Sequence, residues 1–165
     1  YIERVPRLLG VQAQGAQPIV QAFRSGTELV PSRSETIADS IAVGTPRNWR
    51  RALRQIRDSN GHMVAVGDDS ILEAMKMTAR LAAVFGEPAG VAAVAGVQEA
   101  CAQGVIRHDE SVLVVVTGKG LKDIRSAEQA AGEPLDIDPT LDAMQAVLAR
   151  YADGSAPEKR ENRPR

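Results

Sequence analysis

Ser111-Val-Leu-Val-Val-Val-Thr117 is the stretch of this sequence that most narrowly restricts its fold. Five consecutive apolar residues, four of them valine, stand between two hydroxyl residues without any polar alternation. A strand with one solvated face alternates apolar and polar side chains, whereas a continuous run is typical of a parallel strand covered on both faces. The stretch therefore predicts a fully buried strand of a parallel sheet.

Short apolar runs predict two further strands, at Leu8 to Ala13 and at His62 to Val66. Helical periodicity and helix stop signals predict five helices between and after these strands. The first covers 16–25 and is closed by Gly26, and the second runs from Pro46 to just before the Asn60-Gly61 turn. The others cover 68–85 with Asp68 as the cap, 88–104 with Pro88 in the first turn, and 140–151. Residues 34–44 are predicted to form a loop or a short helix. Strands separated by helices predict an α/β fold with a mostly parallel sheet layered with helices.

Composition narrows the class of partner. A length of 165 residues with 44% hydrophobic content is enough for one domain with a core. The 20 basic and 21 acidic side chains nearly cancel and aromatics make up only 3%, so we expect no nucleic-acid partner. No apolar run is long enough for a bilayer span, so we expect no membrane contact. The single Cys101 fits a reducing compartment, and cytoplasm is the expected location.

The two ends of the sequence differ from its middle. The chain starts at Tyr1 and reaches a predicted strand within a few residues, which we interpret as a cut end. Residues 153–165 contain almost nothing that could be buried, so their ordering entropy would not be offset. We therefore divide the chain into a portion of an α/β domain, 1–152, and a disordered tail, 153–165.

The turn Thr117-Gly-Lys-Gly-Leu-Lys-Asp123 leaves the valine-rich stretch and is the first candidate for a ligand site. In open parallel sheets, ligands bind beyond the carboxyl ends of the strands. Two glycines allow the backbone to approach a ligand closely, and Thr117 places a hydroxyl at the strand tip. On spacing alone, a Gly-Lys-Gly turn is more often only a tight turn, and it is not a P-loop.

Four segments, in this order, resemble the threonine synthase family: Leu9-Gly-Val-Gln-Ala-Gln-Gly-Ala-Gln-Pro-Ile19, Thr36-Ile-Ala-Asp-Ser-Ile-Ala-Val-Gly44 with Pro46-Arg-Asn-Trp49, Glu87-Pro-Ala-Gly90, and the turn from Thr117 to Asp123. The resemblance implies part of the large domain of a fold-type II pyridoxal-phosphate enzyme, in the tryptophan-synthase-β fold group. It also implies a lyase of threonine biosynthesis, which turns O-phosphohomoserine and water into threonine and phosphate with pyridoxal 5'-phosphate as the electron sink.

The resemblance carries cofactor-binding roles to four residues. Thr117 matches the hydroxyl residue that hydrogen-bonds the pyridine nitrogen, and Gly118, the next residue, is also expected to bind the cofactor. Ser40 and Glu87 match positions that line the ring. Because a neutral hydroxyl stabilises a pyridinium less than a carboxylate would, the ring nitrogen should stay unprotonated.

The same resemblance implies what this chain does not contain. Its four lysines are Lys76, Lys119, Lys122 and Lys159, and none stands in the Schiff-base motif of the family, which lies upstream of the matched segments. We therefore assign no catalytic residue here. Residues 1–152 are then the C-terminal portion of the catalytic domain, which is not competent alone and which we expect in a homodimer.

Two other possible sites are weighed against simpler interpretations. Related racemases and dehydratases bind a cation through acids near the first strand, but Gln12 and Pro18 stand at the corresponding places, so we predict no metal. Five arginines between Arg47 and Arg57 have near-helical spacing and could bind phosphate groups. A solvated helix face paired with Asp58 and its neighbours is the favoured interpretation.

Two alternatives to threonine synthase remain open from the sequence. One is a threonine or serine ammonia-lyase-like pyridoxal-phosphate enzyme, which the turn from Thr117 to Asp123 fits less well. The other is a non-catalytic α/β binding module that kept the fold and lost the chemistry. A lysine motif followed by a glycine-rich loop upstream of these segments would favour the enzyme.

Overall fold

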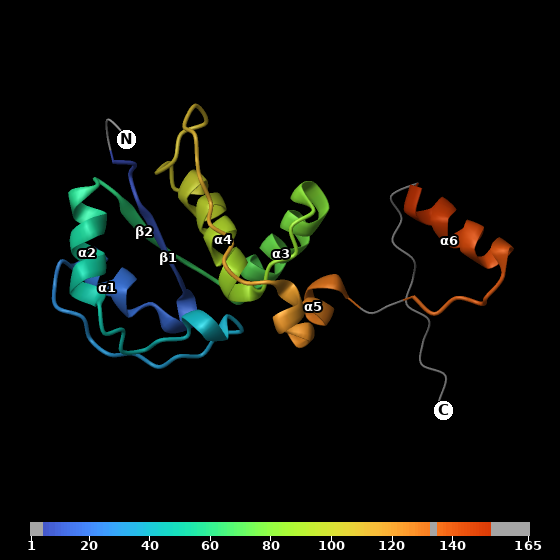
Figure 1. Cartoon of the computed structure of the whole chain (residues 1–165), viewed down its shortest axis with the longest axis horizontal. Coiled ribbons are helices and arrows are strands. Elements are labelled where there is room, and N and C mark those ends of the chain that lie inside the picture. Colours follow the sequence, from blue (N-terminus) through green and yellow to red (C-terminus); the bar gives the residue numbers. More distant parts are fainter. Residues whose placement is uncertain (1–4, 133–134, 153–165) are drawn as a thin grey trace. The chain divides into compact units, whose positions relative to one another are not determined.

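The computed structural model describes residues 5–132 and 135–152 and divides into two compact units, residues 1–132 and 133–165 (Figure 1). The first unit carries all the strands of the described chain. The second carries one helix, α6 (Leu141–Ala152), close to the bounds predicted for the last helix. The tail predicted at 153–165 lies outside the described residues, so the structure does not test it.

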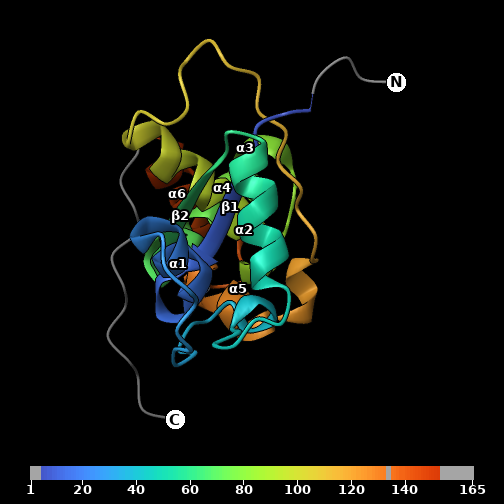
Figure 2. The same cartoon turned by 90° about the vertical axis from the view of Figure 1, so that its left-hand side faces the viewer.

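A parallel pair of strands lies at the centre of the first unit (Figure 2). Strand β1 (Leu9–Ala13) pairs with β2 (His62–Val66) in a register that runs from Leu9 opposite His62 to Ala13 opposite Val66. Both strands lie where the apolar runs predicted them. The α/β class with a parallel sheet is confirmed, since helices separate the two strands in the sequence.

Alternate residues of the strands enter two different cores. Met63 and Ala65 of β2 pack with α1 (Pro18–Ser25) and α2 (Trp49–Asp58), around Val20 and Leu53. Val66 packs instead with α3 (Asp68–Ala82) and α4 (Pro88–Ala102). Because successive side chains of a strand point to opposite faces, this division means that one helix pair covers each face of the sheet.

Local interactions determine where helix α1 begins and ends. Pro18 occupies the first turn, where its missing N–H costs nothing. The buried Gln12 side chain accepts hydrogen bonds at Oε1 from the Ile19 and Val20 amides, at 2.9 and 3.0 Å. Gly26 ends the helix, as predicted, with a left-handed φ of 70°.

The prediction for the stretch from Ser111 to Thr117 was wrong. No strand forms there, and Leu113 and Val115 are 90% and 66% exposed. Within the described residues the only ladder is the one between β1 and β2, so this stretch has neither a neighbouring strand nor a layer on each face. An apolar run is stable as a strand only where such neighbours exist, because β propensity mainly reflects packing on a sheet.

Two smaller differences concern helix starts. Asp68 was predicted to cap α3, but Gly67 holds the cap position and Asp68 is the first helical residue. Helix α5 (Ile124–Ala131) was not predicted; it follows a short 3₁₀ turn, η3 (Gly120–Lys122). The loop predicted at 34–44 is found, with one 3₁₀ turn, η2 (Asp39–Ile41).

Candidate active site

The carboxyl ends of β1 and β2 are covered by the loop that contains Thr36. The Glu35 amide donates to the Gly15 carbonyl at 3.0 Å, directly after β1. Asp68, directly after β2, accepts at its carboxylate from the Thr36 hydroxyl at 2.5 Å and from the Ile37 amide at 3.1 Å. These bonds fix the loop at the sheet edge where open parallel sheets bind ligands.

The turn that follows Thr117 is held on the start of α4. The Glu87 amide donates to the Gly118 carbonyl at 2.9 Å, and the Gly120 amide donates to the Phe85 carbonyl at 2.9 Å. Together they form an isolated antiparallel bridge between Gly86 and Lys119. In both views, η2 and α5 lie toward the end of the unit at which β1 ends (Figures 1 and 2). The turn from Thr117 therefore reaches the same side of the sheet as the Thr36 loop.

Two glycines allow this close contact. A Cβ on Gly90 would lie 2.8 Å from the Gly118 nitrogen and 2.9 Å from its oxygen, and a Cβ on Gly118 would lie 1.9 Å from Glu87 Oε1. Neither position has room for a side chain without displacing a neighbour. The backbone of the turn, the first turn of α4 and the Glu87 carboxylate thus pack as one body.

Glu87 is buried although it carries a charge. Its side chain is 9% exposed, and its carboxylate lies 3.0 Å from Nζ of Lys122, whose side chain is 63% exposed. A buried carboxylate is costly unless it is paired and hydrogen-bonded. The ammonium of Lys122 supplies that pairing from the surface.

Thr117 is exposed, and its hydroxyl has no hydrogen-bond partner within the described residues. It immediately precedes Gly118, so the structure brings Thr117, Gly118 and Glu87 together. Ser40 is also exposed and donates to Asp39 Oδ1 at 3.0 Å. Its 3₁₀ turn, η2, contacts α4, the helix that Glu87 precedes, but the structure gives no direct contact between Ser40 and the other three.

The far end of the turn is fixed by Asp123. Its carboxylate accepts a hydrogen bond from the Ser126 amide at 3.0 Å and caps α5. Hydrogen bonds from Ser126 to the carboxylate lower the pKa of Asp123 from its ordinary value. The turn is therefore held at Gly118, at Gly120 and at Asp123, while the Thr117 hydroxyl makes no hydrogen bond within the described residues.

A family of known proteins matches most of this unit. A model of the family described as "Pyridoxal-phosphate dependent enzyme" matches residues 2–118, which is more than half of the chain. The chain belongs to this family. Pyridoxal phosphate is the cofactor on which the family depends, and the match ends at Gly118, in the turn described above.

Among these pyridoxal-phosphate-dependent enzymes, threonine synthases are similar to this chain at the level of sequence. The threonine synthase of Methanocaldococcus jannaschii is 39% identical over 149 residues, covering 89% of this chain and 37% of that protein. The threonine synthase of Mycobacterium tuberculosis is 39% identical over 140 residues, covering 84% and 37%. The resemblance predicted from the four motifs is confirmed, and the chain spans a little over a third of the length of these relatives.

Solved structures of the family share the fold at lower identity. The Escherichia coli threonine synthase superposes with a TM-score of 0.64 at 18% identity, covering 89% of this chain and 38% of that one. Maize serine racemase superposes with a TM-score of 0.59 at 21% identity, covering 90% and 39%. At these identities the likeness concerns the fold alone, and it is the fold of a pyridoxal-phosphate enzyme.

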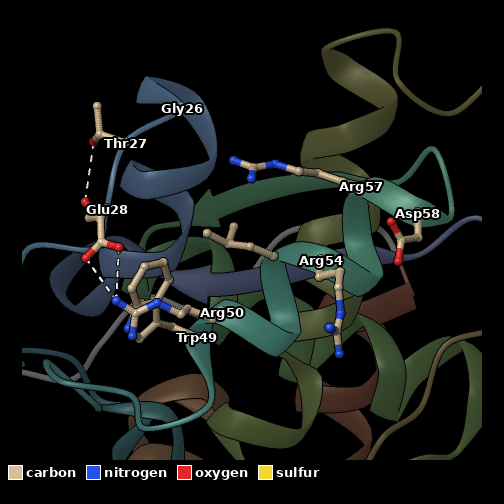
Figure 3. A pocket seen from close by; sticks show the side chains of 9 residues that line it. Gly26, Thr27, Glu28, Trp49, Arg50, Arg54, Arg57 and Asp58 are labelled. Carbon is tan, nitrogen blue, oxygen red and sulfur yellow. Dashed lines mark hydrogen bonds and ion pairs between the residues drawn. The ribbon is translucent and has the colours of Figure 1, made fainter.

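A separate pocket lies away from this turn, between the end of α1 and the face of α2 (Figure 3). It has a volume of about 390 Å³ and contains none of the predicted cofactor residues. Arg50 stacks over the Trp49 ring at 4.4 Å and pairs with Glu28 at 2.9 Å, whereas Arg54 and Arg57 point away from each other. The guanidinium groups of this pocket therefore do not converge on one anion, and the arginine partner is Glu28 rather than Asp58.

Neither a membrane-spanning helix nor a metal cluster is found among the described residues. Within residues 5–132 and 135–152, no helix combines the length and apolarity needed to cross a bilayer. In the same ranges no three His, Cys, Asp or Glu side chains gather as metal ligands. At the position predicted to lack a cation ligand, the Gln12 amide oxygen is already used by α1.

Sequence reasoning overlooked two residues of this region. Lys122 was considered only as part of a motif and as a lysine outside the Schiff-base motif, although it pairs with Glu87. Asp68 was assigned to its own helix, although its carboxylate holds the Thr36 loop. A carboxylate just after a parallel strand, together with the strand-end rule, was a signal that pointed to Asp68; the spacing of Lys122 and Glu87 gave none.

Proposed function

We propose that this chain is the C-terminal portion of a threonine synthase, a lyase that converts O-phosphohomoserine and water into threonine and phosphate. The observation that carries the proposal is the turn at Thr117, which presents a free hydroxyl and is clamped onto the Glu87 end of α4. Identity of 39% to threonine synthases supports this substrate over those of other family members.

The residues present fit the pyridine side of the cofactor. Thr117 carries a hydroxyl that can donate to an unprotonated ring nitrogen, and it makes no competing hydrogen bond in the described residues. The glycine at 118 leaves the backbone open next to that hydroxyl. When bound, pyridoxal phosphate supplies the electron sink for the reaction. This chain would orient the ring, with Glu87 fixing the turn and Ser40 lining the ring from the loop at the strand ends.

In this proposal the lysine that carries the cofactor lies in another part of the protein. Lys119 and Lys122 belong to the candidate turn, and Lys122 is occupied by Glu87. Treating the 165-residue chain with pyridoxal phosphate and borohydride should leave no single lysine labelled at high occupancy. One uniquely labelled lysine would contradict this division of roles.

The reaction is tested on the complete protein that carries this sequence. With O-phosphohomoserine we expect threonine and phosphate to form in equal amounts, and with threonine or serine we expect only background release of ammonia. Chromatography of the amino acids together with a phosphate assay measures the first reaction, and an ammonia assay measures the second. Ammonia release without threonine formation would favour the ammonia-lyase alternative, and neither reaction would favour a binding module.

A further inference from the structure

Lys122 makes the only polar contact that the described residues offer to the Glu87 carboxylate. Nζ lies 3.0 Å from Oε2 and 3.4 Å from Oε1. Exposed ion pairs ordinarily contribute little, because water solvates both charges. This pair differs because the carboxylate is buried, so loss of the lysine would leave a buried charge unpaired.

The Glu87 carboxylate in turn rests on the backbone of Gly118. A Cβ at Gly118 would lie 1.9 Å from Oε1 and 2.5 Å from the Glu87 Cγ, so the carboxylate fills the space where a side chain would stand. The Glu87 amide also donates to the Gly118 carbonyl. Any movement of Glu87 therefore moves the residue that directly follows Thr117.

We infer that Lys122 is a positioning residue of the cofactor site: it holds the Glu87 carboxylate on Gly118 and so fixes the direction in which Thr117 presents its hydroxyl. This inference rests on the proposed function. Lys122 touches neither the cofactor nor the substrate in this account, and its effect passes through Glu87 and Gly118 to Thr117.

The same turn offers a matched control. Lys119 lies three residues earlier and is also exposed, but its side chain makes no polar contact within the described residues. Lys119→Met and Lys122→Met remove the same charge from the same turn. Only the second removes a contact with Glu87, so a difference between them isolates the pair from the general loss of positive charge.

The first measurement is amide hydrogen exchange in the cofactor-free, complete protein. The Glu87 and Gly120 amides report the turn, because they donate to Gly118 and Phe85, and the His62 amide, which donates to Leu8, reports the sheet. Lys122→Met should speed exchange of the two turn amides about fivefold, with His62 unchanged. Lys119→Met should stay within about twofold, and Lys122→Arg should restore the slow rate.

The second measurement follows the cofactor. In protein loaded with pyridoxal phosphate, Lys122→Met should shift the absorbance band of the bound cofactor and raise its Kd about fivefold over that of Lys119→Met. In a Glu87→Gln background, Lys122→Met should add nothing, since no charge is left to hold. A lysine that contributed only to overall stability would leave the band in place.

The outcomes separate the two proposals. If Lys122→Met matched Lys119→Met in both turn exchange and cofactor band, the inference on Lys122 would be wrong even in a protein that binds pyridoxal phosphate. If wild-type protein bound no pyridoxal phosphate while the turn amides still responded to Lys122→Met, the proposed function would be wrong and the contact with Glu87 would stand. If Lys122→Met also speeds exchange of the His62 amide, the effect of Lys122→Met in the Glu87→Gln background decides. No added effect there supports the inference on Lys122, and an added effect contradicts it.

Discussion

Two short apolar runs of this chain, 63–66 in β2 and 112–116, have similar composition and opposite surroundings. In β2, Val64 is fully buried and Val66 is 3% exposed, whereas Leu113 is 90% exposed in the second run, 112–116. The first run has β1 at its edge and a helix pair on each face. The second has no strand beside it in the described residues. An apolar run therefore forms a buried strand only where the rest of the fold supplies a neighbouring strand and a packed layer on each face.

The second run is not uniformly exposed. Val116 packs on the core between α3 and α4, and its side chain would lie 2.9 Å from a Cβ on Gly86. The backbone bridge between Gly86 and Lys119 follows directly. Order in this segment thus comes from its carboxyl end, which is the end that carries Thr117.

The largest expected effect tests the contrast between the two runs. Val64→Asp would place an unpaired carboxylate in a fully buried site and should lower the free energy of unfolding by about 4 kcal/mol or more. Val115→Asp, at a site that is 66% exposed, should change it by less than about 0.5 kcal/mol. Urea unfolding followed by circular dichroism measures both. Equal losses would mean that the second run is buried in solution.

A smaller effect is expected at the contact that fixes the second run. Gly90→Ala places a methyl group 2.8 Å from the Gly118 nitrogen, and the backbone there can yield little. We expect a loss of about 1 to 2 kcal/mol in the free energy of unfolding, although alanine is the better helix former by about 1 kcal/mol. Thermal or urea unfolding measures the sign of this change in the free energy of unfolding. A stabilised Gly90→Ala variant would show that α4 does not pack on the turn.

The smallest expected effect is a pH dependence at the far end of the turn. Since the pKa of Asp123 is lowered in the folded state, its capping of α5 stabilises the fold above the unfolded pKa of about 4 and is lost as the pH falls through the lowered value. Protection of the Ser126 amide should therefore persist at about pH 4 and decrease only as the pH falls further. In Asp123→Asn this decrease should disappear, and a persistent decrease would point to another carboxylate.

Much of the fold follows from sequence patterns, because strand and helix signals are local. The β2 strand and the Pro88 and Gly26 boundaries depend on neighbours within a few residues. The pair of Glu87 with Lys122 spans 35 positions, and the contact of Thr36 with Asp68 spans 32. Such long-range contacts depend on how the helices and strands pack together. The periodicity of the sequence does not predict that packing. The turn at Thr117 was predicted from the strand-end rule and from the family resemblance. The strand that was expected to precede it does not form.

We propose that Thr117 faces the pyridine nitrogen of the cofactor, and the chemical shift of that nitrogen tests this placement. We would bind ¹⁵N-labelled pyridoxal phosphate to the complete protein and record the nitrogen chemical shift in wild type and in Thr117→Asp. Wild type should show an unprotonated nitrogen. The aspartate should raise the pKa of that nitrogen and give the shift of the protonated ring, because an anion beside it favours the charged form. An identical shift in both proteins, with cofactor fully bound, would contradict the account.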